Sequence, residues 1–229
     1  MKRSFIALLS LVFVNLKSFA YDELGNGGNM IYCKNTLYPE MLRQNYMLQD
    51  YLEITQQGYK IEFPDFSFRE DSNKIEDAIF IAQKMLDRIK ELDPHRHMVY
   101  SKELQNFSQN LLLDFNLIFP WLPDHGVVKA PGADCEIIQT AYQREPILPF
   151  HKRYNIKAEV WSLLKVQVKA GLILHEVIYK EAHERGHTVS DRTRQFNGLL
   201  ATNHFENMNI YQYKRFLVDV MKFSYVPTM

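Results

Sequence analysis

The feature that most constrains this chain is the run "AGLILHEVI" from Ala170 to Ile178, in which the only polar side chains are His175 and Glu176. A helix that is apolar on nearly every face is typical of the centre of a domain, because a surface helix carries a polar face. An isolated buried carboxylate is costly, so Glu176 must be neutral, paired or bound to a metal. The sequence therefore predicts a central buried helix around 158–185.

Apolar residues recur at helical spacing in other segments as well, and turn residues mark where these segments begin and end. Gly186 is expected to cap the end of the central helix, and Ser190 to cap the start of the next one. Further helices are expected at 39–58, 72–92, 101–119, 190–203 and 209–221. Short β-prone pieces are expected at 29–33, 59–66 and within 126–145. The predicted fold class is α+β, predominantly helical, with a small β-sheet.

The amino-terminal segment has the pattern of a secretory signal peptide. Two basic residues precede an apolar segment over 5–16, and the small residues Ser18 and Ala20 follow in the arrangement that precedes a cleavage site. A short membrane anchor is the alternative, but the run is shorter than the roughly 18 apolar residues that usually span a bilayer. We expect residues 1–20 to be cleaved and the protein to be exported, to the periplasm or the extracellular space.

The rest of the chain, residues 21–229, is expected to form one globular domain, since it is long enough for one good core. It contains no second apolar stretch of membrane-spanning length, so no integral membrane segment is expected in the mature protein. Basic and acidic residues are equal in number, and loss of residues 1–20 removes only basic ones. The mature chain is then slightly acidic, which does not suggest nucleic-acid binding.

The chain has two cysteines, Cys33 and Cys135, and both lie in the part expected to be exported. An oxidising compartment favours their pairing, so we predict a disulfide that ties the amino-terminal segment to the middle of the chain. Two separate buried thiols are the alternative. Metal binding by this widely spaced pair is disfavoured.

Three interpretations of the His175–Glu176 pair remain open. In the first, which the residues favour, the pair belongs to a buried hydrogen-bonded network that fixes helix packing. In the second, Glu176 is a general acid or base with a pKa raised by burial, and Tyr179 or His187 donates hydrogen bonds. In the third, His175 binds zinc and Glu176 activates a zinc-bound water. Whether the protein is an enzyme at all is left open by its sequence.

The spacing of the histidines disfavours zinc, and no metal site or other cofactor is predicted. A zinc peptidase of the H-E-x-x-H type has a second histidine four residues after the first, whereas Tyr179 stands there. His183 lies two full helical turns from His175, a rise of about 12 Å, which one ion cannot normally bridge from a straight helix. His187 would have to fold back past Gly186.

Three blocks of the sequence, "GNGGNMIYC", "KAGLILHEVIYKEA" and "GHTVSDRTRQFNGLLATN", resemble an uncharacterised family of exported bacterial proteins. Its pattern has a G-N-G-G-D start leading to a cysteine, an L-L-H-E-x-I-Y helix and a G-H-T-D-S-x-x-V-R-x-F-N segment. The resemblance covers these blocks and little else. The matching positions are Asn26, Gly27, Gly28, Cys33, His175, Glu176, Tyr179, Gly186, His187, Thr188, Ser190, Arg194 and Asn197.

The resemblance implies export but supplies no reaction, because the family has no assigned activity. Asn29 and Val189 stand where the pattern has aspartates, so a function that needed those acids is in doubt here. We therefore expect an exported protein of unidentified activity and partners, with a structural His-Glu-x-x-Tyr helix. The alternative is a hydrolase of the cell envelope. Its candidate catalytic residues are Glu176, His175, Tyr179 and His187, supported by Arg194, Asn197, Ser190 and Thr188.

Overall fold

The computed structural model describes residues 25–34, 46–67, 70–117 and 132–225. The expected signal peptide lies outside these residues. Within them, helices and two small sheets alternate, as the predicted α+β class requires. None of the helices in these ranges combines the length and apolar character that a bilayer crossing requires.

The central helix predicted around 158–185 is confirmed, but it is broken once. The break at Leu164 and Lys165 divides it into a short helix α4 (Ala158–Leu163) and a long helix α5 (Val166–Glu184). The end of α5 is built as predicted: Gly186 has a φ of 83°, its N–H donates to the carbonyl of His183 at 2.8 Å, and the N–H of His187 donates to Ala182 at 3.0 Å. This pair of bonds is a Schellman motif, which glycine favours because the left-handed conformation is strained for other residues.

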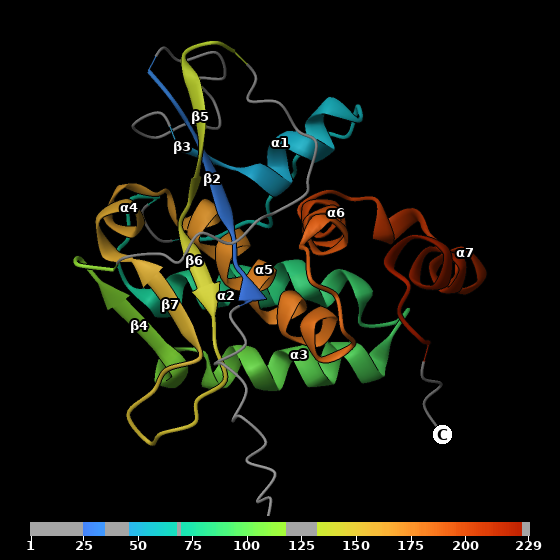
Figure 1. Ribbon diagram of the computed structural model, residues 1–229. Coiled ribbons are helices and arrows are strands. Elements are labelled where there is room, and N and C mark those ends of the chain that lie inside the picture. The colour runs from blue at the N-terminus through green and yellow to red at the C-terminus, as the bar shows by residue number, and fades with distance from the viewer. Residues whose placement is uncertain (1–24, 35–45, 68–69, 118–131, 226–229) are drawn as a thin grey trace, which may run out of the picture.

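The helices around α5 come from both sides of it in the sequence. They are α1 (Gln49–Gln56), α2 (Ile75–Leu86), α3 (Pro94–Asn106) and α4 before it, and α6 (Asp191–Leu200) and α7 (Ile210–Arg215) after it. Short 3₁₀ turns lie at Asp87–Ile89, Ser108–Asn110 and Phe205–Asn207, and a π-helical turn at Phe216–Met221. In Figure 1, α5 runs through the middle of the molecule, with the strands β4 (Leu111–Asp114) and β7 (Tyr154–Lys157) to its left and α6 and α7 to its right.

One sheet has the order β1-β6-β7-β4, and in it only β4 and β7 are parallel. The other has the order β3-β2-β5 and is antiparallel throughout. The strands are β1 (Gly25–Asn26), β2 (Asn29–Cys33), β3 (Tyr46–Leu48), β4 (Leu111–Asp114), β5 (Cys135–Gln139), β6 (Ala141–Gln143) and β7 (Tyr154–Lys157).

The predicted disulfide between Cys33 and Cys135 is confirmed. The two residues face each other where β2 pairs with β5, so the strand pairing itself brings the sulfurs together. The bond closes a segment of 102 residues. A disulfide fits an oxidising compartment, as expected for an exported protein.

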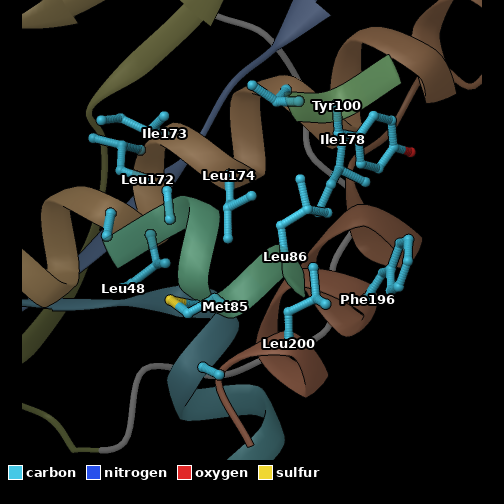
Figure 2. Packing of buried hydrophobic residues seen from close by; sticks show 14 of the residues in the cluster. Leu48, Met85, Leu86, Tyr100, Leu172, Ile173, Leu174, Ile178, Phe196 and Leu200 are labelled. Atoms are coloured by element: carbon cyan, nitrogen blue, oxygen red, sulfur yellow. The ribbon is translucent and has the colours of Figure 1, made fainter. Parts of the chain in front are cut away.

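The main hydrophobic core surrounds α5 and contains side chains from both ends of the described chain, from Met30 to Phe223. Figure 2 shows how α5 meets the neighbouring helices, with Leu174 and Ile178 facing Leu86 of α2 and Phe196 of α6 nearby. Every residue of α5 from Val166 to Tyr179 is buried, so the polar groups in this part of the helix lie inside the protein. That is the setting of His175 and Glu176.

Candidate functional site

His175 is held by a carboxylate that is distant from it in the sequence. Its Nδ1 lies 2.8 Å from Oδ2 of Asp50, in the first turn of α1, and both side chains are fully buried. The same carboxylate oxygen accepts a hydrogen bond from Nδ2 of Asn197 in α6 at 2.7 Å. Asn197 also donates to the carbonyl of Gly171 at 2.9 Å. Asp50 therefore ties α1 to α5 and to α6 at a single point.

The Asp50 carboxylate also sets the proton position on His175. An ionised carboxylate only accepts hydrogen bonds, so Nδ1 of His175 is the donor. Burial acts most strongly on this imidazole and lowers its pKa, but the charge and hydrogen bond of Asp50 outweigh it, so the pKa of His175 is raised. The ring is thus a better base than an exposed histidine, and its Nε2 is the nitrogen left for another partner.

Glu176, the next residue, is held by the glycine-rich turn between β1 and β2. Its Oε1 accepts a hydrogen bond from the N–H of Gly28 at 2.6 Å. A Cβ at Gly27 would lie 2.6 Å from the carbonyl carbon and oxygen of Ala141 and 2.7 Å from Oε1 of Glu176, so only glycine fits between strand and carboxylate. The backbone carbonyl of Glu176 accepts from Nε2 of Gln143 at 2.6 Å.

The environment of Glu176 favours the neutral acid. Burial raises the pKa of this carboxyl, and His175 and the N–H of Gly28 offset the rise only in part. The second oxygen of Glu176, Oε2, has no hydrogen-bonding partner in the part of the chain that the structure describes. The same holds for Nε2 of His175 and Oδ1 of Asp50. Oδ1 of Asn197 is a fourth such atom, and buried polar atoms without a partner are uncommon, so their concentration in one cluster requires an explanation.

Tyr179 lies one turn further along α5 and is fully buried. Its ring centroid is 6.1 Å from that of His175 and 6.1 Å from that of His183, so three rings follow one another along one strip of the helix. Tyr179 thus separates the two histidines.

The candidate residues that follow α5 are divided between the network and the surface. Arg194 donates to Oε1 of Glu53 at 2.7 Å and to Oγ of Ser190 at 2.8 Å, so it joins α6 to α1 one turn away from Asp50. Thr188 is exposed. The Schellman turn carries His187 away from Glu176, and its ring lies 5.5 Å from that of Phe223. Asn197 and Arg194 therefore lie in or near the network, and His187 does not.

A second buried polar cluster, around Arg96 of α3, shows a fully satisfied arrangement for comparison. Arg96 donates to Oε2 of Glu181 at 3.0 Å, to Oε1 at 3.1 Å, and also to Asp93. Tyr100 donates to Glu181, and Tyr213 donates to Asp93 at 3.2 Å. None of these five side chains has a buried polar atom without a partner. Elsewhere in the described residues, single buried polar atoms such as Oδ1 of Asn155 and Oγ1 of Thr193 also have no partner, so what distinguishes the His175 cluster is that several such atoms lie together.

No group of three or more histidine, cysteine, aspartate or glutamate residues is arranged to hold a metal ion within the described ranges.

The two positions where the resembled family has aspartates lie beside the network. Asn29 begins β2 directly after Gly28 and is buried, and Val189 directly precedes Ser190.

The sequence did not reveal Asp50 or Gln143 as parts of the site. The signal at Asp50 is weak but present: it is an acid within the apolar, helix-forming stretch "YMLQDYLEI". A carboxylate flanked in this way is expected to find a partner inside the protein. Its partner, His175, could be identified only from the fold.

The structure brings parts of the three resembled blocks together, since Gly28, His175, Glu176 and Asn197 all belong to one buried network. Comparisons of the chain with protein-family models, curated proteins and solved structures found no match. The resemblance to a family of exported proteins therefore stays a prediction.

Proposed function

We propose that this protein is an exported binding or structural component of the cell envelope, and that its His175–Glu176 centre holds the fold together and does no chemistry. The observation that carries the proposal is the hydrogen bond from Gly28 N–H to Glu176, in a place where neither side chain of the pair is exposed. A catalytic acid or base must reach its substrate. Here the glycine turn covers the carboxylate.

The network connects the segments that a structural lock, meaning a buried set of hydrogen bonds that fixes how distant segments pack, is expected to connect. It joins a turn near the amino terminus, the first turn of α1, the middle of α5 and the body of α6. These segments are far apart in the sequence, and the network fixes their register through directional bonds that apolar packing alone cannot provide. The working surface of such a protein lies elsewhere, on its exterior.

Stability measurements test the proposal without knowledge of a substrate. Glu176→Ala removes the acceptor of a buried N–H and leaves a cavity, so a structural role predicts a loss of about 2–4 kcal/mol in the free energy of unfolding. Glu176→Gln keeps the shape and the acceptor, so it is expected to stay within about 1 kcal/mol of the wild type near neutral pH. Chemical denaturation of the three proteins measures both differences.

A second candidate is a hydrolase, favoured by the unpartnered Oε2 of Glu176 and Nε2 of His175. In that account Glu176 is the general acid or base, His175 orients it or binds a metal ion, and Tyr179 donates a hydrogen bond, whereas His187 lies too far along the turn to take part. The segment over Glu176 would have to open for substrate to enter. The expected compartment would make a polymer of the cell envelope the substrate.

The two candidates predict opposite results for Glu176→Ala. A functional acid held in an unfavourable site destabilises its fold, so its removal leaves the protein equally stable or more stable. For the metal-assisted form of the hydrolase, stoichiometric zinc in protein purified without chelator, absent from His175→Ala, would support it. A wild-type stability at or below that of Glu176→Ala would reject the structural proposal.

A further inference from the structure

The connection between β6 and β7 is a loop that extends away from the core. In Figure 1 it is the yellow loop at the lower left, below the arrows of β6 and β7. Its base is closed by a hydrogen bond from the N–H of Arg144 to the carbonyl of Arg153 at 3.1 Å. Its tip is a turn in which the N–H of His151 donates to the carbonyl of Leu148 at 2.9 Å. Pro149 follows Leu148, the position in a β-turn that proline favours.

The side chains at this tip are large, apolar and exposed. The six residues from Glu145 to Phe150 are all exposed, and among them Ile147 is 64%, Leu148 44% and Phe150 73% accessible to solvent. Single exposed apolar residues are normal, but three large ones within four positions of one protruding turn are not. Such a cluster indicates contact with an apolar environment outside the protein.

The residues at the base of the loop are basic. Arg144 and Lys152 have no carboxylate partner among the described ion pairs, and Lys152 is fixed by donation to the carbonyl of Gln109 at 2.6 Å. The one acid of the loop, Glu145, is paired with Arg153 at 2.6 Å. The loop therefore presents an apolar tip, residues 147–150, in front of a net positive base.

From this arrangement we infer that the β6–β7 loop is a membrane-docking site, whose apolar tip inserts into the interface of an anionic phospholipid bilayer. Apolar side chains gain from entering the boundary between headgroups and acyl chains, and basic side chains just behind them are attracted to anionic headgroups. The proline-containing turn and the closed base hold the tip in shape before contact, so little ordering entropy is lost on binding. This inference does not depend on the role of His175 and Glu176.

The size of the tip favours a membrane over a protein partner. A stable protein–protein interface involves roughly 20–30 residues on each side, arranged over a broad surface. The loop offers six exposed residues on a protrusion. A lipid interface needs no complementary shape, and a few inserted side chains with a basic base are enough for reversible attachment.

A fluorescent label in the loop tests the inference directly. Both native cysteines are bonded to each other, so one introduced cysteine can be labelled selectively. Phe150→Cys carries an environment-sensitive dye at the tip, and Tyr211→Cys carries it at an equally exposed position on α7. The labelled proteins are purified after export and any cleavage by the host cell. They are then mixed with vesicles of phosphatidylethanolamine and phosphatidylglycerol. We expect the emission to rise several-fold at position 150 and to stay unchanged at 211.

Two unlabelled variants measure the contribution of each part of the loop. The double variant Ile147→Ser/Phe150→Ser is expected to lower the vesicle partition coefficient at least about tenfold, because two inserted apolar side chains are lost. Arg144→Gln is expected to lower it about fivefold, and added salt to weaken the wild type. Tyr211→Ser is the matched control and should bind as the wild type does. Circular dichroism confirms that each variant is folded.

Several outcomes would overturn the inference. One is a label at position 150 that does not respond to anionic vesicles, and another is an equal response at 150 and 211. Equal binding to phosphatidylcholine vesicles would reject the role of the basic residues. A label at 150 that responds to an added protein and to no vesicle would make the loop a protein-docking site instead.

Discussion

Asp50 and His175 are 125 residues apart in the sequence and meet through a 2.8 Å contact in the interior of the protein. Asp50 accepts from Asn197 with the same oxygen, and Glu176 beside His175 accepts from Gly28. His175 and Glu176 in the apolar helix α5 therefore belong to a hydrogen-bonded network whose other members come from α1, α6 and the glycine turn. The predictions below follow from that geometry.

Loss of the Asp50 carboxylate is expected to destabilise the protein strongly. Asp50→Ala leaves His175 and Asn197 without their buried acceptor, and breaking a buried pair in this way costs about 3–5 kcal/mol. Denaturant unfolding measures the change. The exposed Asp219, in an ion pair with Arg215, supplies the control, since Asp219→Ala should change stability by less than about 0.5 kcal/mol. Equal changes in the free energy of unfolding for the two substitutions would show that Asp50 does not stabilise the fold through His175 and Asn197.

The stability difference between the wild type and Glu176→Gln is expected to depend on pH. Burial raises the pKa of Glu176 above its ordinary value of 4.5. The folded state then holds this proton more tightly than the unfolded state, so the wild type loses stability as pH rises from 4.5 through the folded pKa. Glutamine does not titrate in this range. The melting temperature of Glu176→Gln should therefore rise relative to that of the wild type as the pH increases.

Calorimetry of both proteins from acidic to alkaline pH measures this gain. His175, whose raised pKa means stability present below 6.5 and lost as pH rises through the folded value, remains in both proteins. The difference between them therefore reports the titration of Glu176 together with the part of the rise in the His175 pKa that the charge of Glu176 causes. A difference that stays constant with pH would show that Glu176 is not buried as a neutral acid.

The two glycines of the turn are expected to differ in their tolerance of a side chain. A Cβ at Gly27 would meet backbone atoms of Ala141, which cannot move without disturbing β6. At Gly28 the nearest atom is the end of the Leu172 side chain, which can change its conformation. Gly27→Ala should therefore lower the melting temperature more than Gly28→Ala does. The reverse order in thermal unfolding would contradict the packing of this turn.

Reduction of the disulfide is expected to destabilise the protein substantially. In the chain-entropy model, a bond that closes about 100 residues contributes about 4–5 kcal/mol. A thiol assay on denatured protein should find none before reduction and two after it. The double variant Cys33→Ser/Cys135→Ser should unfold like the reduced wild type. Two reactive thiols in untreated protein would show that the bond does not form.

Local patterns identified the parts of the fold that depend on local interactions. Helix α5, its Gly186 cap and the position where α6 begins follow from periodicity and turn residues that lie next to each other in the chain. Ser190 directly precedes α6 as predicted, but its side chain makes no cap hydrogen bond, and its Oγ accepts from Arg194 instead. The disulfide was predicted from the cysteine count and the compartment. These features require no knowledge of which distant segments meet.

Other predictions failed because distant pairing overrides local preference. The helix expected over 101–119 ends at Asn106, since Leu111–Asp114 pairs in parallel with β7 as β4. The edge strand expected at 59–66 is not a strand, and the N–H of Glu62 donates instead to the carbonyl of Ala201. Of the helix expected over 39–58, residues 39–45 lie outside the described residues, Tyr46–Leu48 pairs with β2 as a strand, and only Gln49–Gln56 is helical. Each outcome depends on a partner that the local sequence does not specify.

The candidate site shows the same division. His175, Glu176 and Tyr179 were found because polar residues stand out in an apolar helix. Asp50 was missed because its partner is 125 residues away. His187 was a candidate because of its closeness in sequence, but the turn at Gly186 directs it toward Phe223.

Hydrogen exchange at the amide of Gly28 most directly tests the central claim that the network is structural. This N–H donates the hydrogen bond that holds the glycine turn over Glu176. If the network is a structural lock, this amide exchanges only when the whole protein unfolds, and its free energy of opening equals the global free energy of unfolding. NMR at increasing denaturant measures both values. Exchange of Gly28 through a local opening of much lower free energy would contradict the account, since it would show that the carboxylate is regularly uncovered.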